Sequence, residues 1–301
     1  MIDSHLDFEP KLRVKASGYG GSGYAIPQPG KAKPLRLPGV TTVLNNLPKD
    51  AVNQWAVDNT VAYMIANLDR VLDLEDDVIF QKYRWYWKRQ PKVDDPEVSP
   101  NNYHVGVLHD AAETGTLVHD WIAAHVLGLF EPEIQKIEQE QAITAFLNWE
   151  RDHDIELLFV EHTVVNETLG YAGTLDHIWK LDGEISLVDT KTSRGIYDSH
   201  VAQLAALNHA EYMMIETGNP EHMKYRTKQW GDTYWEIGQI PEYSRVGILK
   251  CRFDDFDKDG NDVPAVCEFT ELPQEQLDIG WDLFVASHQM ATARRDWKKI
   301  A

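Results

Sequence analysis

The dipeptide Asp182-Gly183 constrains the fold of this chain more than any other feature. It stands between two runs typical of β-strands, YAGTLDHIWKL before it and EISLVDTKT after it. Asp-Gly favours a two-residue type I′ turn, because both central residues of that turn have positive φ. In such a hairpin Leu181 faces Glu184, and the numbers of every facing pair have the same sum. Asp176 is therefore expected to face Asp189.

Two carboxylates that face each other across a hairpin repel unless a positive group lies between them, because their Cβ atoms are about 4.5 to 5.5 Å apart. A divalent cation would be such a group. Lys191 lies two residues beyond Asp189 and so on the same strand face. A metal that activates water and an ammonium that stabilises charge on a phosphate are suited to phosphodiester hydrolysis.

The alternative is that Asp176 and Asp189 point into solvent and Lys191 forms a surface ion pair, worth at most about 1 kcal/mol. The tripeptide D-x-K alone is frequent on solvated strands. However, SLVDTKT is an apolar strand, in which a buried carboxylate needs a partner.

The rest of the sequence predicts helices on both sides of this region. The expected helices are 48–68, 77–90, 104–127, 132–152, 199–216 and 273–298. Further strands are expected at 156–165, 244–253 and 263–270, and a loop-rich stretch with Trp230 and Trp235. This order predicts an α/β (α+β) fold in which a small central mixed β-sheet is flanked by helices.

We expect two parts along the chain. Residues 1–38 are expected to form an irregular Gly/Pro-rich N-terminal segment, with basic residues Lys31, Lys33 and Arg36. Residues 39–301 are expected to form a single domain. Within it, 39–152 is mainly helical, and 153–301 holds the sheet core with the hairpin and the closing helices.

Composition excludes some classes of function. The chain has 29 Lys and Arg residues against 48 Asp and Glu residues, a net charge of −19, which argues against a general basic surface for nucleic acid or membrane. Two cysteines are too few for a four-cysteine iron–sulfur cluster and predict buried thiols. Without a leader or an apolar run of about 18 residues, we expect a cytoplasmic protein with no membrane span.

Several short motifs surround the hairpin in a definite order. They are LPGVTTVLNNLPKDAVNQWA, GTLVHDWI, VEHTVV, GTLD, DTK and the helix that contains Gln203. Together, over residues 38–215, they resemble the RecB-like branch of the PD-(D/E)xK nuclease superfamily, and the first of them resembles the N-terminal region of phage-encoded members. The resemblance implies a restriction-endonuclease-like core with a helical N-terminal region, without an iron–sulfur cluster.

The resemblance also implies roles for single residues. Asp176 and Asp189 would be metal ligands, and Lys191 would be the catalytic lysine. His119 would be a further metal ligand, and the backbone carbonyl of Thr190 would complete the ligand set. Such hard ligands favour Mg²⁺ or Mn²⁺, and an imidazole ligand suits Mn²⁺ well.

Two further residues match the family's catalytic groups. Glu161 would lie on the first strand, as a ligand or as an acceptor beside one. Gln203 matches the Gln of the QxxxY motif, which in the family reaches the catalytic region or the DNA, but Leu207 stands where Tyr is usual. Taken without the resemblance, His119 has no ligand at helical spacing, since His109 and His125 are ten and six residues away.

The stretch KYRWYWKR at 82–89 interleaves aromatic rings with four cations and is a candidate surface for DNA. An alternative is a helix with a Trp/Tyr core face and a solvated basic face. The expected DNA-binding residues are Lys82, Arg84, Trp85, Lys88, Arg89 and Arg194.

These observations predict a Mg²⁺- or Mn²⁺-dependent DNA nuclease of phage-type recombination, replication or repair. By the resemblance, an exonuclease is favoured over an endonuclease. Its substrate would be a linear duplex end or a single strand, in the host-cell cytoplasm if a phage encodes it, and a homo-oligomer or a phage recombination protein would be a further partner. Two alternatives stay open: a non-catalytic nucleic-acid-binding or protein-interaction module on the same fold, and a metal-dependent phosphoesterase for small substrates.

Overall fold

The computed structural model describes residues 11–15, 21–48, 50–66, 68, 100–256 and 260–300. Contacts divide the chain into two compact units, one of residues 1–47 and 117–301 and one of residues 48–116. We expected one domain over 39–301, whereas the contacts separate 48–116 from the remainder. The helix expected at 77–90 lies outside the described residues.

The unit of residues 48–116 contains α2 (Asp50–Ala66) and the first part of α5 (Pro100–Val126). The rest of α5, from Leu117, belongs to the larger unit. Among the described residues, no helix is both long enough and apolar enough to cross a membrane.

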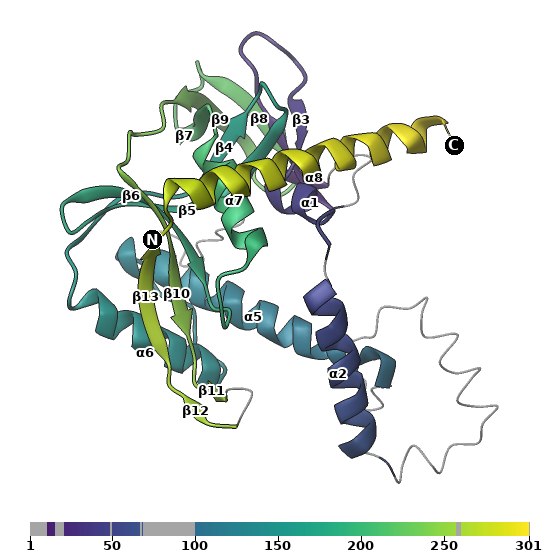
Figure 1. The fold of residues 1–301 in the computed structure, drawn as a ribbon. Coiled ribbons are helices and arrows are strands. Elements are labelled where there is room, and N and C mark those ends of the chain that lie inside the picture. The colour runs from purple at the N-terminus through teal and green to yellow at the C-terminus, as the bar shows by residue number, and fades with distance from the viewer. Residues whose placement is uncertain are drawn as a thin grey trace. The chain divides into compact units, whose positions relative to one another are not determined.

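An eight-stranded mixed sheet forms the centre of the larger unit (Figure 1). The strand order is β13-β10-β6-β5-β4-β7-β9-β8, in which β6 and β10 are parallel and the other neighbours antiparallel. The strands are β4 (Ile155–Asn166), β5 (Tyr171–Leu181), β6 (Glu184–Lys191), β7 (Tyr212–Thr217), β8 (Met223–Thr227), β9 (Gly231–Gly238), β10 (Arg245–Arg252) and β13 (Val266–Glu271). A mixed sheet flanked by helices is confirmed, but it is not small.

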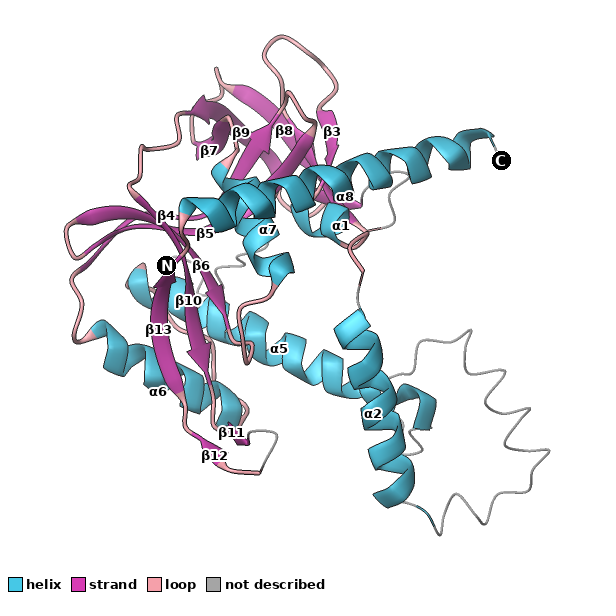
Figure 2. Cartoon of the chain, in the orientation of Figure 1, coloured by secondary structure: helices cyan, strands magenta, loops and turns pink. Residues whose placement is uncertain are grey.

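Both faces of this sheet are covered (Figure 2). On one face lie α1 (Val40–Leu44), α7 (Asp198–Asn208) and α8 (Gln274–Ile300). On the other, α6 (Ile137–Glu150) and the end of α5 pack at one end of the sheet. Strand alternation separates the two faces, because Ile178 packs with the first group and Trp179 with the second.

The expectation that residues 1–38 are irregular is wrong for the described part of that segment. It forms an antiparallel sheet of β1 (Arg13–Lys15), β2 (Ser22–Ile26) and β3 (Leu35–Pro38). Tyr24 and Ile26 are buried against Val165, Ala172 and other residues of the large sheet. The strands are only three to five residues long, and distant strands complete their apolar core.

Two further expectations need correction. The helix expected at 199–216 ends at Asn208, and Tyr212–Thr217 is the strand β7. Short apolar runs fit either a helix or a buried strand, so the sequence YMMIET does not decide between them. The stretch expected to be a loop around Trp230 and Trp235 contains β8 and β9, a pair of strands at the edge of the sheet.

Candidate functional site

The β5–β6 hairpin has the turn and register that the sequence predicts. Asp182 and Gly183 both have positive φ, 51° and 88°, as a type I′ turn requires. The paired residues run from Leu181 with Glu184 to His177 with Val188. In addition, the Asp182 carboxylate accepts hydrogen bonds that fasten the turn to the chain before β4.

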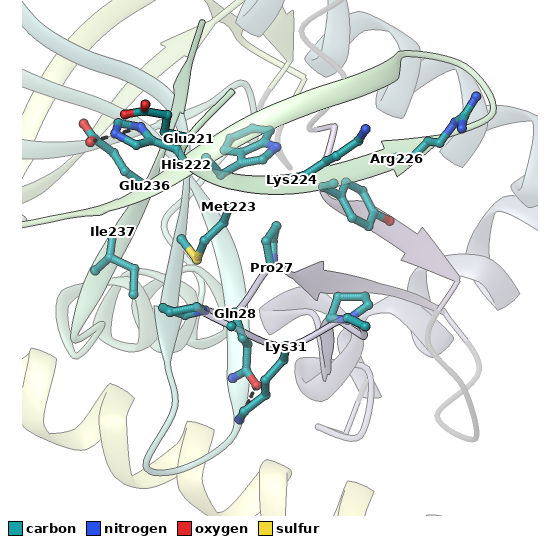
Figure 3. A pocket seen from close by; sticks show the side chains of 16 residues that line it. Pro27, Gln28, Lys31, Glu221, His222, Met223, Lys224, Arg226, Glu236 and Ile237 are labelled. Carbon is teal, nitrogen blue, oxygen red and sulfur yellow. Dashed lines mark hydrogen bonds and ion pairs between the residues drawn. The ribbon is translucent and has the colours of Figure 1, made fainter. Parts of the chain in front are cut away.

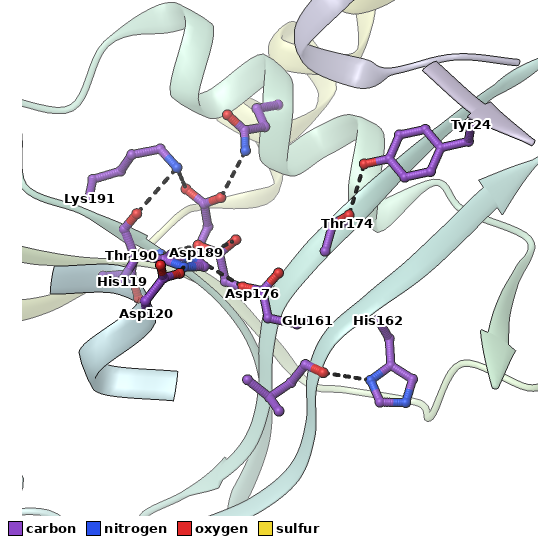
Figure 4. Close-up of polar contacts among 12 residues, drawn as sticks. Tyr24, His119, Asp120, Glu161, His162, Thr174, Asp176, Asp189, Thr190 and Lys191 are labelled. Atoms are coloured by element: carbon purple, nitrogen blue, oxygen red, sulfur yellow. Dashed lines mark hydrogen bonds and ion pairs between the residues drawn. The ribbon is translucent and has the colours of Figure 1, made fainter. Parts of the chain in front are cut away.

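Asp176 and Asp189 come directly after the last pair of this ladder, and their carboxylates are held by different donors (Figure 4). The backbone N–H of Thr190 donates to Asp176 Oδ2 at 2.8 Å. Lys191 Nζ lies 2.5 Å from Asp189 Oδ2, and Gln203 Nε2 donates to Asp189 Oδ1 at 3.1 Å. The hairpin therefore brings the two carboxylates, the lysine and the glutamine into one site.

His119 of α5 lies between two carboxylates of the sheet. Its Nε2 atom is 3.1 Å from Glu161 Oε1 and 3.1 Å from Asp176 Oδ1. These three ligand atoms lie within 4.8 Å of one another. Asp189 is not part of this group, because its oxygens face Lys191 and Gln203 instead.

The backbone of β4 brings Glu161 to this point through two irregularities. A shift in register between Leu157 and Phe159 interrupts the pairing with β5. Glu161 itself has a φ of 53°, a left-handed conformation that costs energy for a residue with a side chain. Strained backbone of this kind often marks a functional position, and neither irregularity is visible in the sequence pattern.

The charges of the site shift each other's pKa values. Burial raises the pKa of Glu161 to about 8, although the charge of His119 opposes the rise. Burial also raises the pKa of Asp189 to about 6 against the charge of Lys191. For Asp176 burial acts in the same direction, but the charge and hydrogen bond of His119 lower its pKa below the usual range.

The pKa values of His119 and Lys191 are both raised, although burial alone would lower them. Burial would lower the pKa of His119, but the nearby carboxylates, Asp176 first, raise it well above its usual value. Burial would likewise lower the pKa of Lys191, and the charges of Asp189 and Asp176 raise it. The carboxylates therefore favour the charged forms of His119 and Lys191.

The donor set fits a divalent cation. A single N–H at His119 Nε2 cannot serve two carboxylate oxygens fully, and Glu161 Oε1 is buried without a hydrogen bond. A cation at the centre of Nε2, Glu161 Oε1 and Asp176 Oδ1 would satisfy all three atoms, with the imidazole neutral. Asp120 lies 3.7 Å from His119 Nδ1, where a carboxylate can orient a ligating imidazole.

Sequence reasoning did not single out Asp120 or His177. Asp120 directly follows His119 in GTLVHDWI, and this adjacency could have indicated that its carboxylate lies beside the imidazole. His177 is fully buried next to Trp179, and burial lowers its pKa to about 3, so its ring is neutral. Its position after Asp176 in GTLDHIW gave no sign that it faces α5 at a ring distance of 6.0 Å from His119.

The expected DNA-binding residues are only partly described. Lys82, Arg84, Trp85, Lys88 and Arg89 lie outside the described residues. Arg194 is described and highly exposed, but it forms an ion pair and a hydrogen bond with Asp255.

Packing explains why residue 207 is Leu rather than the Tyr of the QxxxY motif. The side chain is buried beneath the sheet, close to Gly173 of β5, where a Cβ atom would already be 2.7 Å from Leu207 Cδ2. A larger side chain at 207 would need space that this contact does not leave. The helix α7 therefore presents Gln203 to the site and Leu207 to the core.

A pocket of about 810 Å³ lies elsewhere, between the β2–β3 loop and the strands β8 and β9 (Figure 3). Its lining includes Gln28, Lys31, Met223 and Tyr225, and none of the residues of the carboxylate site. Buried ionisable groups converge in the region of His119 and Lys191 instead.

Comparison of the sequence with family models and with curated proteins gives no match in either.

Proposed function

We propose that this protein is a Mg²⁺- or Mn²⁺-dependent DNA nuclease. The observation that carries the proposal is the convergence of His119 Nε2, Glu161 Oε1 and Asp176 Oδ1 within 4.8 Å, next to the buried pair of Asp189 and Lys191. Glu161 Oε1 is buried there without a hydrogen bond, and a cation held by the three ligand atoms would supply its missing partner. The motif order described above supports the same function.

Metal binding and charge stabilisation would fall to different residues of the site. His119, Glu161 and Asp176 would hold the cation, which, when bound, activates water and polarises a phosphoryl oxygen. Lys191 Nζ, 3.3 Å from the Thr190 carbonyl, is placed to stabilise charge that develops on the phosphate.

Two other residues keep the ligands in place. The Thr190 N–H orients the carboxylate of Asp176, and Gln203 orients that of Asp189. Asp189, which contacts Lys191 and Gln203, would be a further ligand when the cation is bound. In this proposal the Thr190 carbonyl remains a further ligand for the cation.

The proposed substrate is DNA with an accessible end or a single-stranded segment. A net charge of −19 keeps binding along a whole duplex weak, so the strand must enter a locally basic site. An exonuclease that acts in recombination, replication or repair in the cytoplasm is the form that the motif order favours.

The direct test is degradation of linear DNA by the purified chain with and without Mg²⁺ or Mn²⁺. We expect metal-dependent degradation that Lys191→Ala slows by at least about 10²-fold, because a preorganised charge at the transition state is lost. Lys180→Ala is the matched control, since Lys180 is an exposed lysine of the same hairpin, and it should retain activity.

The outcomes separate the alternatives. Activity without metal, or undiminished in Lys191→Ala, would contradict the nuclease proposal. Hydrolysis of a small phosphodiester without any binding of DNA would indicate the phosphoesterase. Covalently closed circular DNA that survives while linear DNA is degraded would identify an exonuclease.

A further inference from the structure

Arg13 of β1 lies on the same face of the three-stranded sheet as Tyr24, which packs against the large sheet. It pairs directly with Tyr24 of β2, and directly paired residues of antiparallel strands project from the same face. Tyr24 is buried between the small and large sheets, whereas the Arg13 side chain is exposed. Arg36 of β3 pairs with Ala25 of β2, the residue after Tyr24, and so projects from the opposite face.

The Tyr24 hydroxyl links this face to the strands that carry the metal ligands. It shares a hydrogen bond of 2.8 Å with Thr174 Oγ1 (Figure 4), and Thr174 pairs with Thr163. Two residues further along these two strands are Asp176 and Glu161. The face of the small sheet that carries Arg13 is therefore joined, through Tyr24, to β5 two residues before Asp176.

Within the described part of the chain, the Arg13 guanidinium uses few of its hydrogen-bond donors. Among the residues that the structure describes, its one hydrogen bond is to Ser22 Oγ at 3.3 Å, and no carboxylate forms an ion pair with it. By contrast, Lys191 and Arg194 are each held by an aspartate.

We propose that Arg13 binds a phosphate group of the nucleic-acid strand held at the metal cluster. A guanidinium offers a planar fork of donors that matches phosphate oxygens, and the Arg13 side chain is exposed. The phosphate would be one that neighbours the bond to be cleaved, since Lys191 already serves the reacting group. This inference rests on the proposed function, because it requires a nucleic-acid substrate.

The test measures binding of a fluorescently labelled single-stranded oligonucleotide as a function of salt concentration, with Mg²⁺ present. All variants carry Lys191→Ala, which limits cleavage during the measurement. Each phosphate contact to a single strand contributes about 0.7 to the slope of log K against log salt. We expect Arg13→Ala to reduce that slope by about 0.7 and to weaken binding about tenfold at low salt. Arg36→Ala is the matched control and should change the slope little.

Two further measurements distinguish phosphate binding from a purely structural role. With Lys191 intact, Arg13→Ala should raise KM for the oligonucleotide while kcat stays nearly constant, because the contact is present in both the bound substrate and the transition state. Arg13→Lys should retain the salt slope and part of the affinity, since it keeps the charge but loses the fork.

The possible results distinguish the role of Arg13 from the nuclease proposal. A protein that degrades DNA with the same slope and KM in Arg13→Ala as in Arg36→Ala would overturn the role of Arg13 and leave the nuclease proposal standing. Another result is a wild-type protein that binds the oligonucleotide without cleaving it, while Arg13→Ala reduces the slope of log K against log salt. That result would support phosphate binding by Arg13 and contradict the nuclease proposal. A wild-type protein that binds no oligonucleotide would overturn both.

Discussion

Helix α5 contributes a histidine to two groups that resemble metal sites, and the two differ in burial. His109, Asp110 and Glu113 have ligand atoms within 4.8 Å of one another, and all three are exposed. His119 forms the second group with Glu161 and Asp176, which come from neighbouring strands and are largely buried.

The difference shows why spacing alone is poor evidence for a metal site. His109 and Glu113 are an i, i+4 pair at 3.3 Å with both side chains about half exposed, a contact that water solvates and that is worth about 0.3 to 0.5 kcal/mol. His119 and its carboxylates have lost most of that water, and Glu161 Oε1 has no hydrogen bond in exchange. Of these two groups, the buried one contains a carboxylate oxygen without a hydrogen-bond partner.

The largest expected effect separates the two groups by activity. Asp176→Asn should reduce metal-dependent degradation of DNA by about 10³-fold, because it removes a charged ligand while keeping the shape and the bond from Thr190. His109→Ala should leave the rate within a factor of about two. Initial rates at saturating Mn²⁺ compare the variants, and equal losses in both would remove the distinction between the groups.

A smaller effect concerns stability and pH without metal. The folded chain keeps a proton on Glu161 up to pH about 8, while the unfolded chain releases it near the usual 4.5. The unfolding free energy should therefore fall as pH rises from about 5 to 8. The raised pKa of His119 has the same sign, because its stabilising charge is lost as pH rises above 6.5.

Glu161→Gln tests this account because it removes the charge and keeps the shape. We expect the variant to be more stable than the wild type at pH 8 by at least about 1 kcal/mol, and to differ little at pH 5. Glu113→Gln in the exposed group provides the control and should shift neither value. Chemical denaturation in the presence of a chelator measures both, and a wild type whose stability rises with pH over this range would contradict the burial argument.

Local turn chemistry explains why part of the site could be predicted from the sequence. Asp182 and Gly183 favour one turn, that turn fixes the register, and the register places Asp176 beside Asp189. The position of Lys191 then follows from strand alternation. These steps depend on residues close in sequence, so no knowledge of distant packing was needed.

The rest of the site depends on contacts between distant segments. His119 reaches Asp176 only because α5 packs on the sheet, and the register shift and left-handed φ that place Glu161 have no local sequence signal. The three-stranded sheet was missed for the same reason, since the partners that bury Tyr24 lie about 140 or more residues away. Short strands with glycine and proline between them resemble an irregular segment until those partners are known.

The most direct test of the central claim is a crystal structure of the protein with Mn²⁺, in which anomalous scattering locates the ion. The account predicts an ion bound by His119 Nε2, Glu161 and Asp176, with Asp189 turned toward it from Lys191. Mn²⁺ bound only at His109, Asp110 and Glu113, or no ion beside His119 at saturating Mn²⁺, would contradict it.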